Sequence, residues 1–330
     1  MLFNGGEKLI LLKRDPPKKL LLANSLLRRL DPNHELFSYY TNLSNRLQAG
    51  FQGEKRVDRH WLEITNLDKH YLLFNYECFN EFGFPHQIDT LLLTSKFLLI
   101  IDIKNISGRI DYDEDKHQLI RTNIDGSFDS FSSPFDQVIR HGQYFTRVFN
   151  QLKIPLPIEC AIISSNPSTI IGNMPKHPLF FHVSGLRFYI NKLVSNYDSV
   201  LSAQEMDRIS KFLMANLKRQ EPKVEIPIEH LRKGVLCEIC NFKVQMQYRR
   251  GTWCCSKCGV RNKKAIFQAL DDYRLLINDR ITNQELRDFF GVHSVYTASK
   301  VLLRLGLPTV GENRGRHYLI PENIIEGGPF

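Results

Sequence analysis

Two apolar segments separated by only two residues constrain the fold more than any other feature of this sequence. Residues 86–94 read HQIDTLLLT and residues 97–104 read FLLIIDIK, with Ser95 and Lys96 between them. Apolar runs of this length are typical of strands buried on both faces, and a two-residue connection joins antiparallel neighbours. The stretch therefore predicts a hairpin inside a buried sheet.

Three charged residues, Asp89, Asp102 and Lys104, interrupt this hairpin. If Thr94 pairs with Phe97 across the turn, Asp89 lies opposite Asp102, and Lys104 shares their face because side chains alternate along a strand. Two adjacent carboxylates repel each other unless a cation lies between them, and hard oxygen ligands suit Mg²⁺ or Mn²⁺. We therefore predict a divalent metal site here, with Lys104 beside the attacking water. The alternative is that the acids only mark strand ends and that Lys104 is solvated.

The elements around the hairpin predict an α/β (α+β) domain. Capping residues, prolines and apolar periodicity indicate a series of helices and strands. The helices are expected from Asp31 to near Gly50, from Gly53, from Ser133, and after the capping box of Ser202 and Glu205; strands are expected at 71–78, 158–164 and 179–189, and a polar stretch at 111–133.

Four short motifs, in this order, resemble the NERD domain, the nuclease-related domain of the PD-(D/E)xK superfamily. They are GEKRV at 53–57, HQIDTLLLT at 86–94, IDIKNISGRI at 101–110 and FDQVIRH at 135–141. The resemblance implies a restriction-endonuclease-like core, which is a mixed sheet flanked by helices, and a Mg²⁺-dependent phosphodiesterase activity.

The resemblance also implies roles for individual residues. Asp89 and Asp102 would hold the metal, and Lys104 would act on the nucleophile. Glu54 and Gln137 would line the site from neighbouring helices. The family pattern usually has Glu at the position of Asp102, although the superfamily motif permits either acid. Without the resemblance, Glu54 could simply favour a helix dipole and Gln137 could belong to a solvated helix face.

Five of the seven cysteines cluster in the C-terminal third of the chain. Two CxxC pairs with fourteen residues between them predict a zinc ribbon, in which four thiolates close the coordination of a structural Zn²⁺. The expected ligands are Cys237, Cys240, Cys255 and Cys258. Cys254 is a spare thiol that could compete with Cys255.

The C-terminal region resembles a winged helix-turn-helix. Thr282 and Glu285 have capping-box spacing before one helix, Ser294 can cap the next, and residues 306–320 suggest a hairpin. Such a module would contact DNA through its second helix and its wing. Helix pairs of this kind also dock proteins. With the ribbon included, the candidate nucleic-acid contacts are Arg249, Arg250, Tyr296, Thr297, Ser299, Lys300, Arg314 and Arg316.

The net charge of +9 is carried by the two ends of the chain. Residues 1–30 hold seven basic and two acidic side chains, residues 221–330 hold seventeen and twelve, and residues 31–220 hold twenty and twenty-one. Positive ends suit a polyanion partner, although a solvated basic surface would give the same counts. We expect DNA as the partner, with RNA not excluded and a protein partner left open.

No apolar run approaches the roughly 18–20 residues of a membrane span, and clustered cysteines favour metal over disulfides. We therefore expect a cytoplasmic protein without a membrane partner. The predicted parts are a basic arm at 1–30, a NERD-like nuclease domain at 31–219, a linker at 220–234, a zinc ribbon at 235–262 and a winged-helix-like domain at 263–330.

Together these features predict a metal-dependent nuclease that hydrolyses phosphodiester bonds of DNA and is delivered by its C-terminal modules. The rival hypothesis is a catalytically inert, nuclease-like DNA-binding protein with a regulatory or scaffold role.

Overall fold

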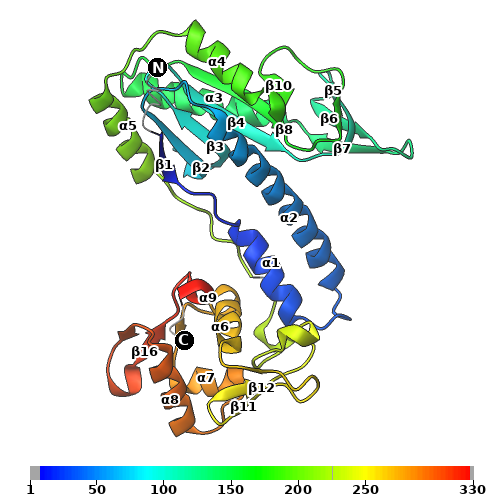
Figure 1. The fold of residues 1–330 in the computed structure, drawn as a ribbon, viewed down its shortest axis with the longest axis vertical. Coiled ribbons are helices and arrows are strands. Elements are labelled where there is room, and N and C mark those ends of the chain that lie inside the picture. The colour runs from blue at the N-terminus through cyan, green and yellow to red at the C-terminus, as the bar shows by residue number, and fades with distance from the viewer. Residues whose placement is uncertain (1–7, 225, 328–330) are drawn as a thin grey trace. The chain divides into compact units, whose positions relative to one another are not determined.

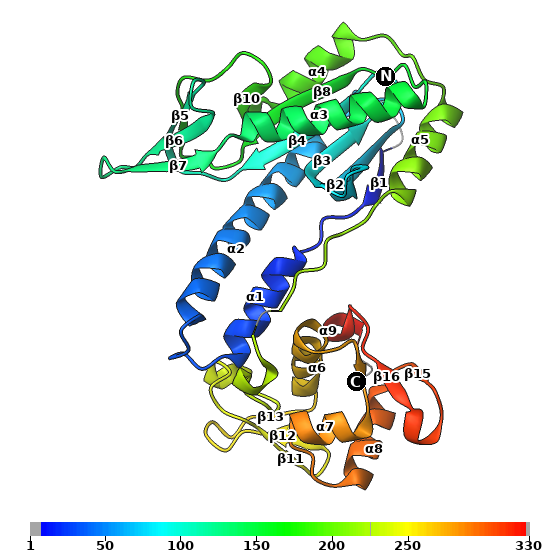
Figure 2. The ribbon, with the colours of Figure 1, turned by 180° about the vertical axis from the view of Figure 1, so that it is seen from behind.

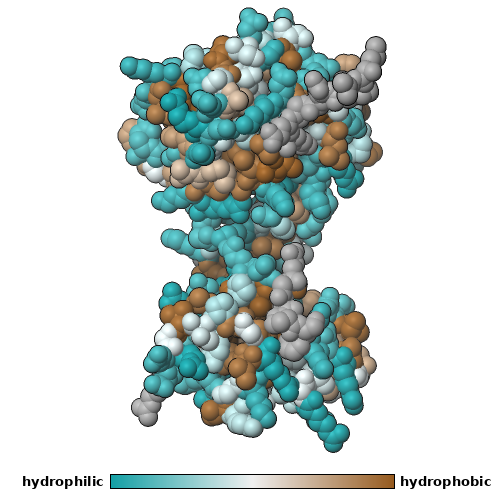
Figure 3. All heavy atoms as spheres, turned by 60° about the vertical axis from the view of Figure 1, so that its left-hand side comes forward, coloured by the Kyte–Doolittle hydropathy of each residue, from teal (hydrophilic) through white to brown (hydrophobic). Residues whose placement is uncertain are grey.

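The computed structural model describes residues 8–224 and 226–327, which form two compact units (Figure 1). The first unit holds the described residues up to Pro16 together with Gln48–Glu221, and the second holds Pro17–Leu47 with the described residues from Pro222 onward. No helix within these described ranges is long and apolar enough to cross a membrane. On the face drawn in Figure 3, hydrophobic side chains occur in scattered groups between hydrophilic ones.

A six-stranded mixed sheet forms the centre of the first unit, in the order β1-β2-β3-β4-β8-β10. The pairs β1–β2, β4–β8 and β8–β10 are parallel, and β2–β3 and β3–β4 are antiparallel. Its strands are β1 (Lys8–Leu12), β2 (His70–Phe79), β3 (Pro85–Leu93), β4 (Leu98–Lys104), β8 (Ile158–Ser164) and β10 (Leu179–His182). The predicted hairpin is confirmed as β3 and β4, because Leu93 pairs with Leu98.

Helices cover both faces of this sheet. One face packs against α3 (Pro134–Gln151) and α5 (Ala203–Ala215), and Figure 2 shows α3 lying across it. The other face packs against α4 (Leu186–Asn196) and the C-terminal half of α2 (Phe37–His60). Strands β3 and β4 are therefore buried from both sides, as their apolar runs predict. The mixed sheet flanked by helices confirms the predicted fold class.

The caps of the two helices on the first face behave as their sequences predict. Ser133 accepts a hydrogen bond from the backbone N–H of Asp136 at the start of α3. Ser202 and Glu205 form a complete capping box at the start of α5. These caps satisfy backbone N–H groups that have no partner within the helix.

Two predictions about elements of the first unit are wrong. The helices expected before and after Gly50 are one continuous helix, α2, which begins at Phe37 rather than near Asp31. Neither Gly50 nor Gly53 has the positive φ of a glycine that ends a helix, so α2 continues through both. The strand expected at 179–189 ends at His182, and α4 follows it after a short 3₁₀ turn.

The polar stretch at 111–133 contributes to a second, four-stranded sheet in the order β7-β6-β5-β9, which no periodicity indicates. One face of this sheet packs against the core through Ile110, Tyr112 and Leu119, and most of its other residues are exposed or half-buried, which explains the polar composition. The strands are β5 (Gly108–Asp113), β6 (Gln118–Thr122), β7 (Phe128–Ser132) and β9 (Thr169–Ile171).

The second unit contains two small three-stranded sheets and a group of helices. The sheets have the orders β11-β12-β13 and β14-β16-β15. The elements are α1 (Lys18–Arg29), α6 (Ala265–Leu276), α7 (Asn283–Phe290), α8 (Val295–Leu305), α9 (Ile324–Gly327), β11 (Gln247–Arg249), β12 (Thr252–Cys254), β13 (Arg261–Asn262), β14 (Arg280–Ile281), β15 (Thr309–Val310) and β16 (His317–Leu319).

The predicted division of the chain differs from these units at two places. Residues 17–47 group with the C-terminal part, because Leu22 and Leu26 of α1 share an apolar cluster with Leu276. Arg29 reinforces this packing through a buried ion pair with Asp272, at 2.8 Å. The cysteine region and the following helices also share a single core rather than forming separate ones. The functional division of the chain remains a prediction.

Candidate active site

The two aspartates lie where the hairpin ladder ends. The last pair between β3 and β4 is Thr90 with Ile101, so one further step brings Asp89 opposite Asp102, as predicted. The Oδ2 atom of Asp89 accepts a hydrogen bond of 2.7 Å from the backbone N–H of Ile103. A side chain therefore takes the place of the next backbone pair, and both acids are held at the end of a rigid, buried hairpin.

Lys104 and Gln137 complete this side of the site. The Lys104 Nζ atom lies 2.9 Å from Asp102 Oδ2 and donates hydrogen bonds to Asp102 Oδ1 at 3.2 Å and to Gln137 Oε1 at 3.4 Å. Gln137 reaches the site from the first turns of α3. The structure thus brings these predicted residues together around one ammonium group.

Glu54 reaches the site because α2 approaches the sheet very closely. A Cβ atom added at Gly53 would lie 2.5 Å from Asn105 Cβ and 2.6 Å from Ser165 Oγ. Only glycine permits this contact, and the next residue, Glu54, is thereby brought beside the hairpin. The glycine at position 53 is therefore explained by the close approach of α2 to the sheet, and not by the start of a helix at this position.

An arginine from the N-terminal segment also lies in this acidic group. The guanidinium of Arg14 donates hydrogen bonds to Glu54 Oε2 at 2.6 Å and to both carboxylate oxygens of Asp58, at 2.7 and 3.1 Å. It also donates to Asn75 Oδ1 at 2.7 Å and to the backbone oxygen of Asp89 at 2.8 Å. Its side chain is only 3% exposed. Arg14 therefore acts as an internal counter-ion that fixes Glu54 and Asp58.

Asn75, which accepts a hydrogen bond from Arg14, has an unusual backbone conformation. It lies opposite Asp89 in the register of β2 and β3, between the pairs of Phe74 and Tyr76, and has a φ of +50°. Asparagine tolerates this left-handed conformation better than most residues, and a strained residue in mid-strand is typical of a functional site.

The electrostatics of the site point to an excess of negative charge. Burial and the neighbouring Glu54 and Asp102 carboxylates hold the pKa of Asp89 well above its usual range. Burial raises the pKa of Glu54 more than the ion pair with Arg14 lowers it. Burial alone would lower the pKa of Lys104, but the Asp102 and Asp89 carboxylates raise it overall. Burial is the main cause of the shifts at Asp89 and Glu54, whereas the shift at Lys104 comes from the neighbouring carboxylates.

The donor set fits a divalent cation held by two carboxylates. Asp102 is 4% exposed, and its Oδ2 atom accepts no hydrogen bond of good geometry within the described residues. The Lys104 ammonium, 2.9 Å away, is the counter-charge of this oxygen, and a metal ion would supply a further partner. However, no three acidic side chains of the described part bring their oxygens within 4.8 Å of one another. The site therefore offers Asp89 and Asp102, with Glu54 held by Arg14.

The cysteine prediction is confirmed in its geometry. The Sγ atoms of Cys237 and Cys258 lie 3.7 Å apart, and those of Cys240 and Cys255 lie 3.8 Å apart. A tetrahedron with Zn–S bonds of about 2.3 Å has edges of about 3.8 Å. All four thiols lie within 4.8 Å of one another, and Cys254 is not among them. The group could therefore bind zinc.

The aromatic residues around the cysteines lie in or against the core, whereas the neighbouring arginines lie on the surface. Trp253 is buried, and Tyr248 packs against its ring with centroids 5.1 Å apart. Arg249 and Arg250 are exposed. Trp253 therefore supplies the core of the second unit, whereas the arginines are available to a partner.

The helix pair and hairpin of the C-terminal region are confirmed as elements. Thr282 and Glu285 form a complete capping box before α7, Ser294 caps α8, and β15 pairs antiparallel with β16. Several predicted contact residues lie on exposed positions of α8 and of the hairpin, and Thr297 is half-buried; the exposed ones are Tyr296, Ser299, Lys300 and Arg316. The Arg314 side chain lies outside the described part of the structure. Contact of these residues with nucleic acid stays a prediction.

Residues 49–165 match the family described as "NERD: Nuclease-related domain", which confirms the resemblance for this segment. Among solved structures, the chain is similar to the small subunit of a heterodimeric restriction endonuclease, with 15% identity, a TM-score of 0.24, and coverage of 51% of this chain and 90% of that one. At this TM-score the likeness carries no weight for the fold. No curated protein matches the chain.

Sequence reasoning missed Arg14, Asp58 and Asn75. Asp58 follows Glu54 by four residues on one helix, so helical spacing could have identified it. Arg14 lies 40 residues before Glu54, and no local pattern connects the two. Only the parallel pairing of β1 with β2 brings the N-terminal segment to the site.

Proposed function

We propose that the first unit hydrolyses phosphodiester bonds of DNA with Mg²⁺ or Mn²⁺ at the site formed by Asp89, Asp102 and Lys104. The observation that carries this proposal is the position of Asp89 and Asp102, one step past the last β3–β4 pair and beside an ammonium group, within a segment that matches a nuclease-related family. Asp89 and Asp102 would hold the metal, which when bound stabilises charge on the phosphate and lowers the pKa of a water molecule.

The chain's own residues prepare this site for a phosphate and a water molecule. Asp102 and Gln137 hold the Lys104 ammonium, which can donate a hydrogen bond to the attacking water or to a phosphate oxygen. The Ile103 N–H fixes the Asp89 carboxylate. These groups need no reorganisation when the substrate arrives.

In the same proposal, the second unit delivers the substrate. Its four cysteines would hold a structural Zn²⁺, and its α7–α8 pair with the β15–β16 hairpin would act as a winged helix on DNA. Exposed cations and hydrogen-bonding groups on α8 and the hairpin support this role. RNA as the substrate would require the same phosphate chemistry.

One observation favours the rival function, an inert nuclease-like binding domain. Arg14 already places a buried positive charge among Glu54, Asp58 and Asp89, and this charge partly neutralises the acidic group without a metal. A domain of this kind would bind DNA or a protein partner without cleaving its ligand.

A cleavage assay separates the two functions. Purified full-length protein is incubated with plasmid, linear duplex, single-stranded DNA and RNA in Mg²⁺, Mn²⁺ or EDTA. We expect cleavage of DNA that requires the metal and is abolished in Lys104→Ala, while Asp113→Asn, which removes an acid of β5 outside the site, retains it. Metal-independent cleavage, or none with any substrate, would contradict the proposal.

A further inference from the structure

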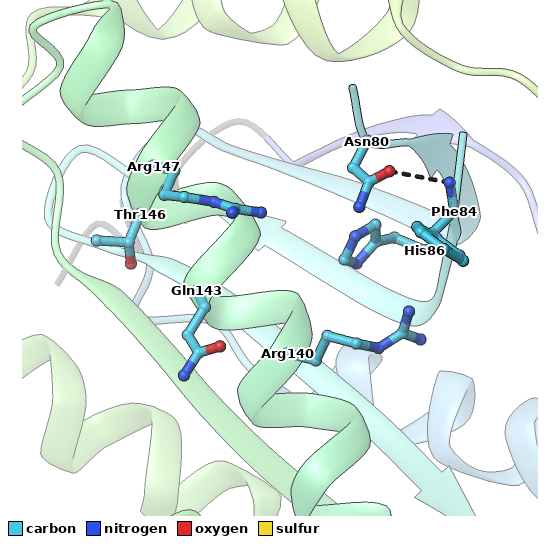
Figure 4. A pocket seen from close by; sticks show the side chains of 7 residues that line it. All are labelled: Asn80, Phe84, His86, Arg140, Gln143, Thr146 and Arg147. Carbon is cyan, nitrogen blue, oxygen red and sulfur yellow. Dashed lines mark hydrogen bonds between the residues drawn. The ribbon is translucent and has the colours of Figure 1, made fainter. Parts of the chain in front are cut away.

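A cavity of about 590 Å³ lies in the first unit between α3 and the turn that joins β2 to β3 (Figure 4). The cavity is lined by Asn80, Phe84, His86, Arg140, Gln143, Thr146 and Arg147. Two of them are cationic, and none of the described lining residues is acidic. The composition of the cavity therefore favours an anionic ligand.

The two arginines lie on one face of α3 and extend toward the turn (Figure 4). Arg140 donates one hydrogen bond of 3.3 Å to the backbone oxygen of Pro85. Arg147 lies 3.8 Å from Glu81, and both of these side chains are more than half exposed. A guanidinium has five N–H donors, so these interactions leave most of the donors of each arginine for a ligand.

A buried histidine supplies the second, independent sign of a ligand. His86 is 1% exposed, and its Nδ1 atom lies 2.9 Å from Nδ1 of His141. Burial lowers the pKa of His86 to about 4 and that of His141 to about 3, so both rings are neutral near pH 7. The Nε2 atoms of both rings are buried and have no hydrogen-bond partner among the described residues. His86 lines the cavity, so its unpaired Nε2 atom is a buried polar group close to the proposed ligand.

The turn itself presents two phenylalanines to solvent. Phe82 is 74% exposed and Phe84 is 61% exposed. Their backbone N–H groups donate to Asn80 Oδ1 at 3.0 and 2.9 Å, so the turn is held in place by one carboxamide. Single exposed phenylalanines are ordinary, but two on a fixed turn beside a cationic cavity match the combination of aromatic and cationic groups that binds unpaired nucleotides.

The cavity adjoins the candidate active site through α3. Arg140 follows Gln137 by three residues, and Gln137 contacts Lys104. Along the helix, Arg140 therefore lies about 4.5 Å from Gln137, and Arg147 lies about 15 Å from it. A strand bound at the site would pass the cavity with a neighbouring nucleotide.

We propose that this cavity binds an unpaired nucleotide of a single-stranded nucleic acid next to the scissile phosphate. Phe84 stacks on the base, and Arg140 and Arg147 bind phosphate. The adjacency to a scissile phosphate rests on the proposed function, whereas the binding itself requires no cleavage. The cavity would thus give the enzyme a preference for frayed, gapped or single-stranded substrates.

Binding and cross-linking in EDTA test this proposal without any need for catalysis. Full-length protein is titrated with a fluorescent single-stranded 12-mer at several salt concentrations, and the same oligonucleotide with 5-iodouracil is cross-linked and mapped by mass spectrometry. The variants are Phe84→Ala and the double substitution Arg140→Ala with Arg147→Ala. The matched control replaces Arg187 and Phe188, an exposed cation–π pair with 5.3 Å between the guanidinium carbon and the ring centroid on α4.

The two variants should differ in their response to salt. Phe84→Ala should weaken binding about tenfold with an unchanged salt slope, because stacking carries no counterion release. The arginine double variant should weaken binding and reduce the slope of log affinity against log salt by about 0.7 for each phosphate that it no longer neutralises. Cross-links should map to the turn that contains Phe82 and Phe84. The α4 control should match the wild-type protein.

Any of the following results would overturn the proposal: wild-type affinity and slope in the arginine variant, cross-links confined to other segments, or an equal effect of the α4 control. A duplex bound as tightly as the single strand with the same dependence on Phe84 would also contradict it. If binding fits but no substrate is cleaved, the proposed function fails and the nucleotide site stands.

Discussion

The cysteine group and the acidic group are both metal sites by sequence pattern, yet the structure builds them in different ways. The four thiols converge within 4.8 Å of one another, whereas no three described acids do so. Protein groups already hold parts of the acidic site, because Arg14 binds Glu54, Ile103 N–H binds Asp89, and Lys104 binds Asp102. The first arrangement suits an ion that is part of the fold, and the second suits an ion that exchanges with the solvent.

The parts of the protein around the two sites also differ in how much regular structure and apolar core they contain. The first unit has a six-stranded sheet with apolar clusters on both faces. The strands of the cysteine region, β11, β12 and β13, have only two or three residues each. We therefore expect metal removal to unfold the cysteine region and to leave the fold of the first unit intact. Each unit has one tryptophan, Trp61 or Trp253, that can report on it separately.

Metal removal from the cysteine group should have the largest effect. Elemental analysis should find one zinc per chain, and a strong chelator or Cys237→Ser should remove it. The removal should cost on the order of 10 kcal/mol of folding free energy, because a structural zinc site couples binding to folding. In a Trp61→Phe background, the emission of Trp253 should shift to that of a solvent-exposed indole.

The matched control for this experiment is Cys254→Ser, because Cys254 neighbours the group without belonging to it. That variant should keep its zinc and its Trp253 emission. Unchanged Trp253 emission in the metal-free protein would show that the cysteine region folds without zinc, and would contradict the proposed difference between the two metal sites.

Substitutions in the acid–lysine group should have the next largest effect, and only on catalysis. Asp89→Ala and Lys104→Ala should each lower the cleavage rate about 1,000-fold or more, roughly 4 kcal/mol, because each removes a preorganised charge from the site. Asp102→Glu should retain activity. In a Trp253→Phe background, Trp61 emission should show that all three variants fold. Cleavage by Lys104→Ala at the wild-type rate would place the chemistry elsewhere.

Removal of the internal counter-ion should have a smaller effect, this time on stability. Arg14→Met should lower the free energy of unfolding of the first unit by about 3 kcal/mol, because it leaves partly buried carboxylates unpaired. Urea unfolding followed by Trp61 measures this change. Adding Glu54→Gln should restore part of the stability, and Lys13→Met, at an exposed neighbouring position, should leave the midpoint unchanged. Equal midpoints for all variants would mean that Arg14 is not a structural counter-ion.

The histidine pair predicts a still smaller effect that depends on pH. The pKa values of His86 and His141, about 4 and about 3 in the folded protein, lie below the unfolded value of about 6.5. Above pH 6.5 both states are neutral at these rings, and below it the unfolded state binds more protons. The free energy of unfolding should therefore fall as the pH falls from 6.5 toward 4, by about 1 kcal/mol per pH unit for each histidine.

The raised pKa values of Glu54 and Asp89 act in the opposite direction, so the comparison must be between variants. Between pH 7 and pH 5.5, the urea midpoint should fall further for the wild-type unit than for His141→Gln, which lacks one titrating ring. The same dependence in both proteins would show that the pair does not control the acid response.

Features that depend on a few consecutive residues could be predicted from the sequence. The capping boxes at Ser202 and Thr282, the register of the hairpin and the choice of Cys255 over Cys254 all follow local rules, and the structure confirms each of them. The four motifs identified the nuclease-related segment for the same reason, since each motif is short and their order is fixed.

Features that depend on distant contacts could not be predicted in this way. The sequence around Gly53 indicates the start of a helix, whereas the role of this glycine is set by Asn105 and Ser165, which are far away in the sequence. Arg14 has no recognisable pattern, because its partners are distributed over α2, β2 and β3. The grouping of α1 with α6 likewise depends on a cluster that no periodicity specifies.

The outer strands β1 and β10 have a consequence for anyone who isolates the nuclease-related segment. Both strands lie outside the matched range of 49–165, and each covers one end of the sheet. Without them, β2 and β8 would present rows of unpaired backbone N–H and C=O groups, which invite pairing with another chain. A fragment cut to the matched residues would therefore self-associate into aggregates, and its inactivity would say nothing about catalysis.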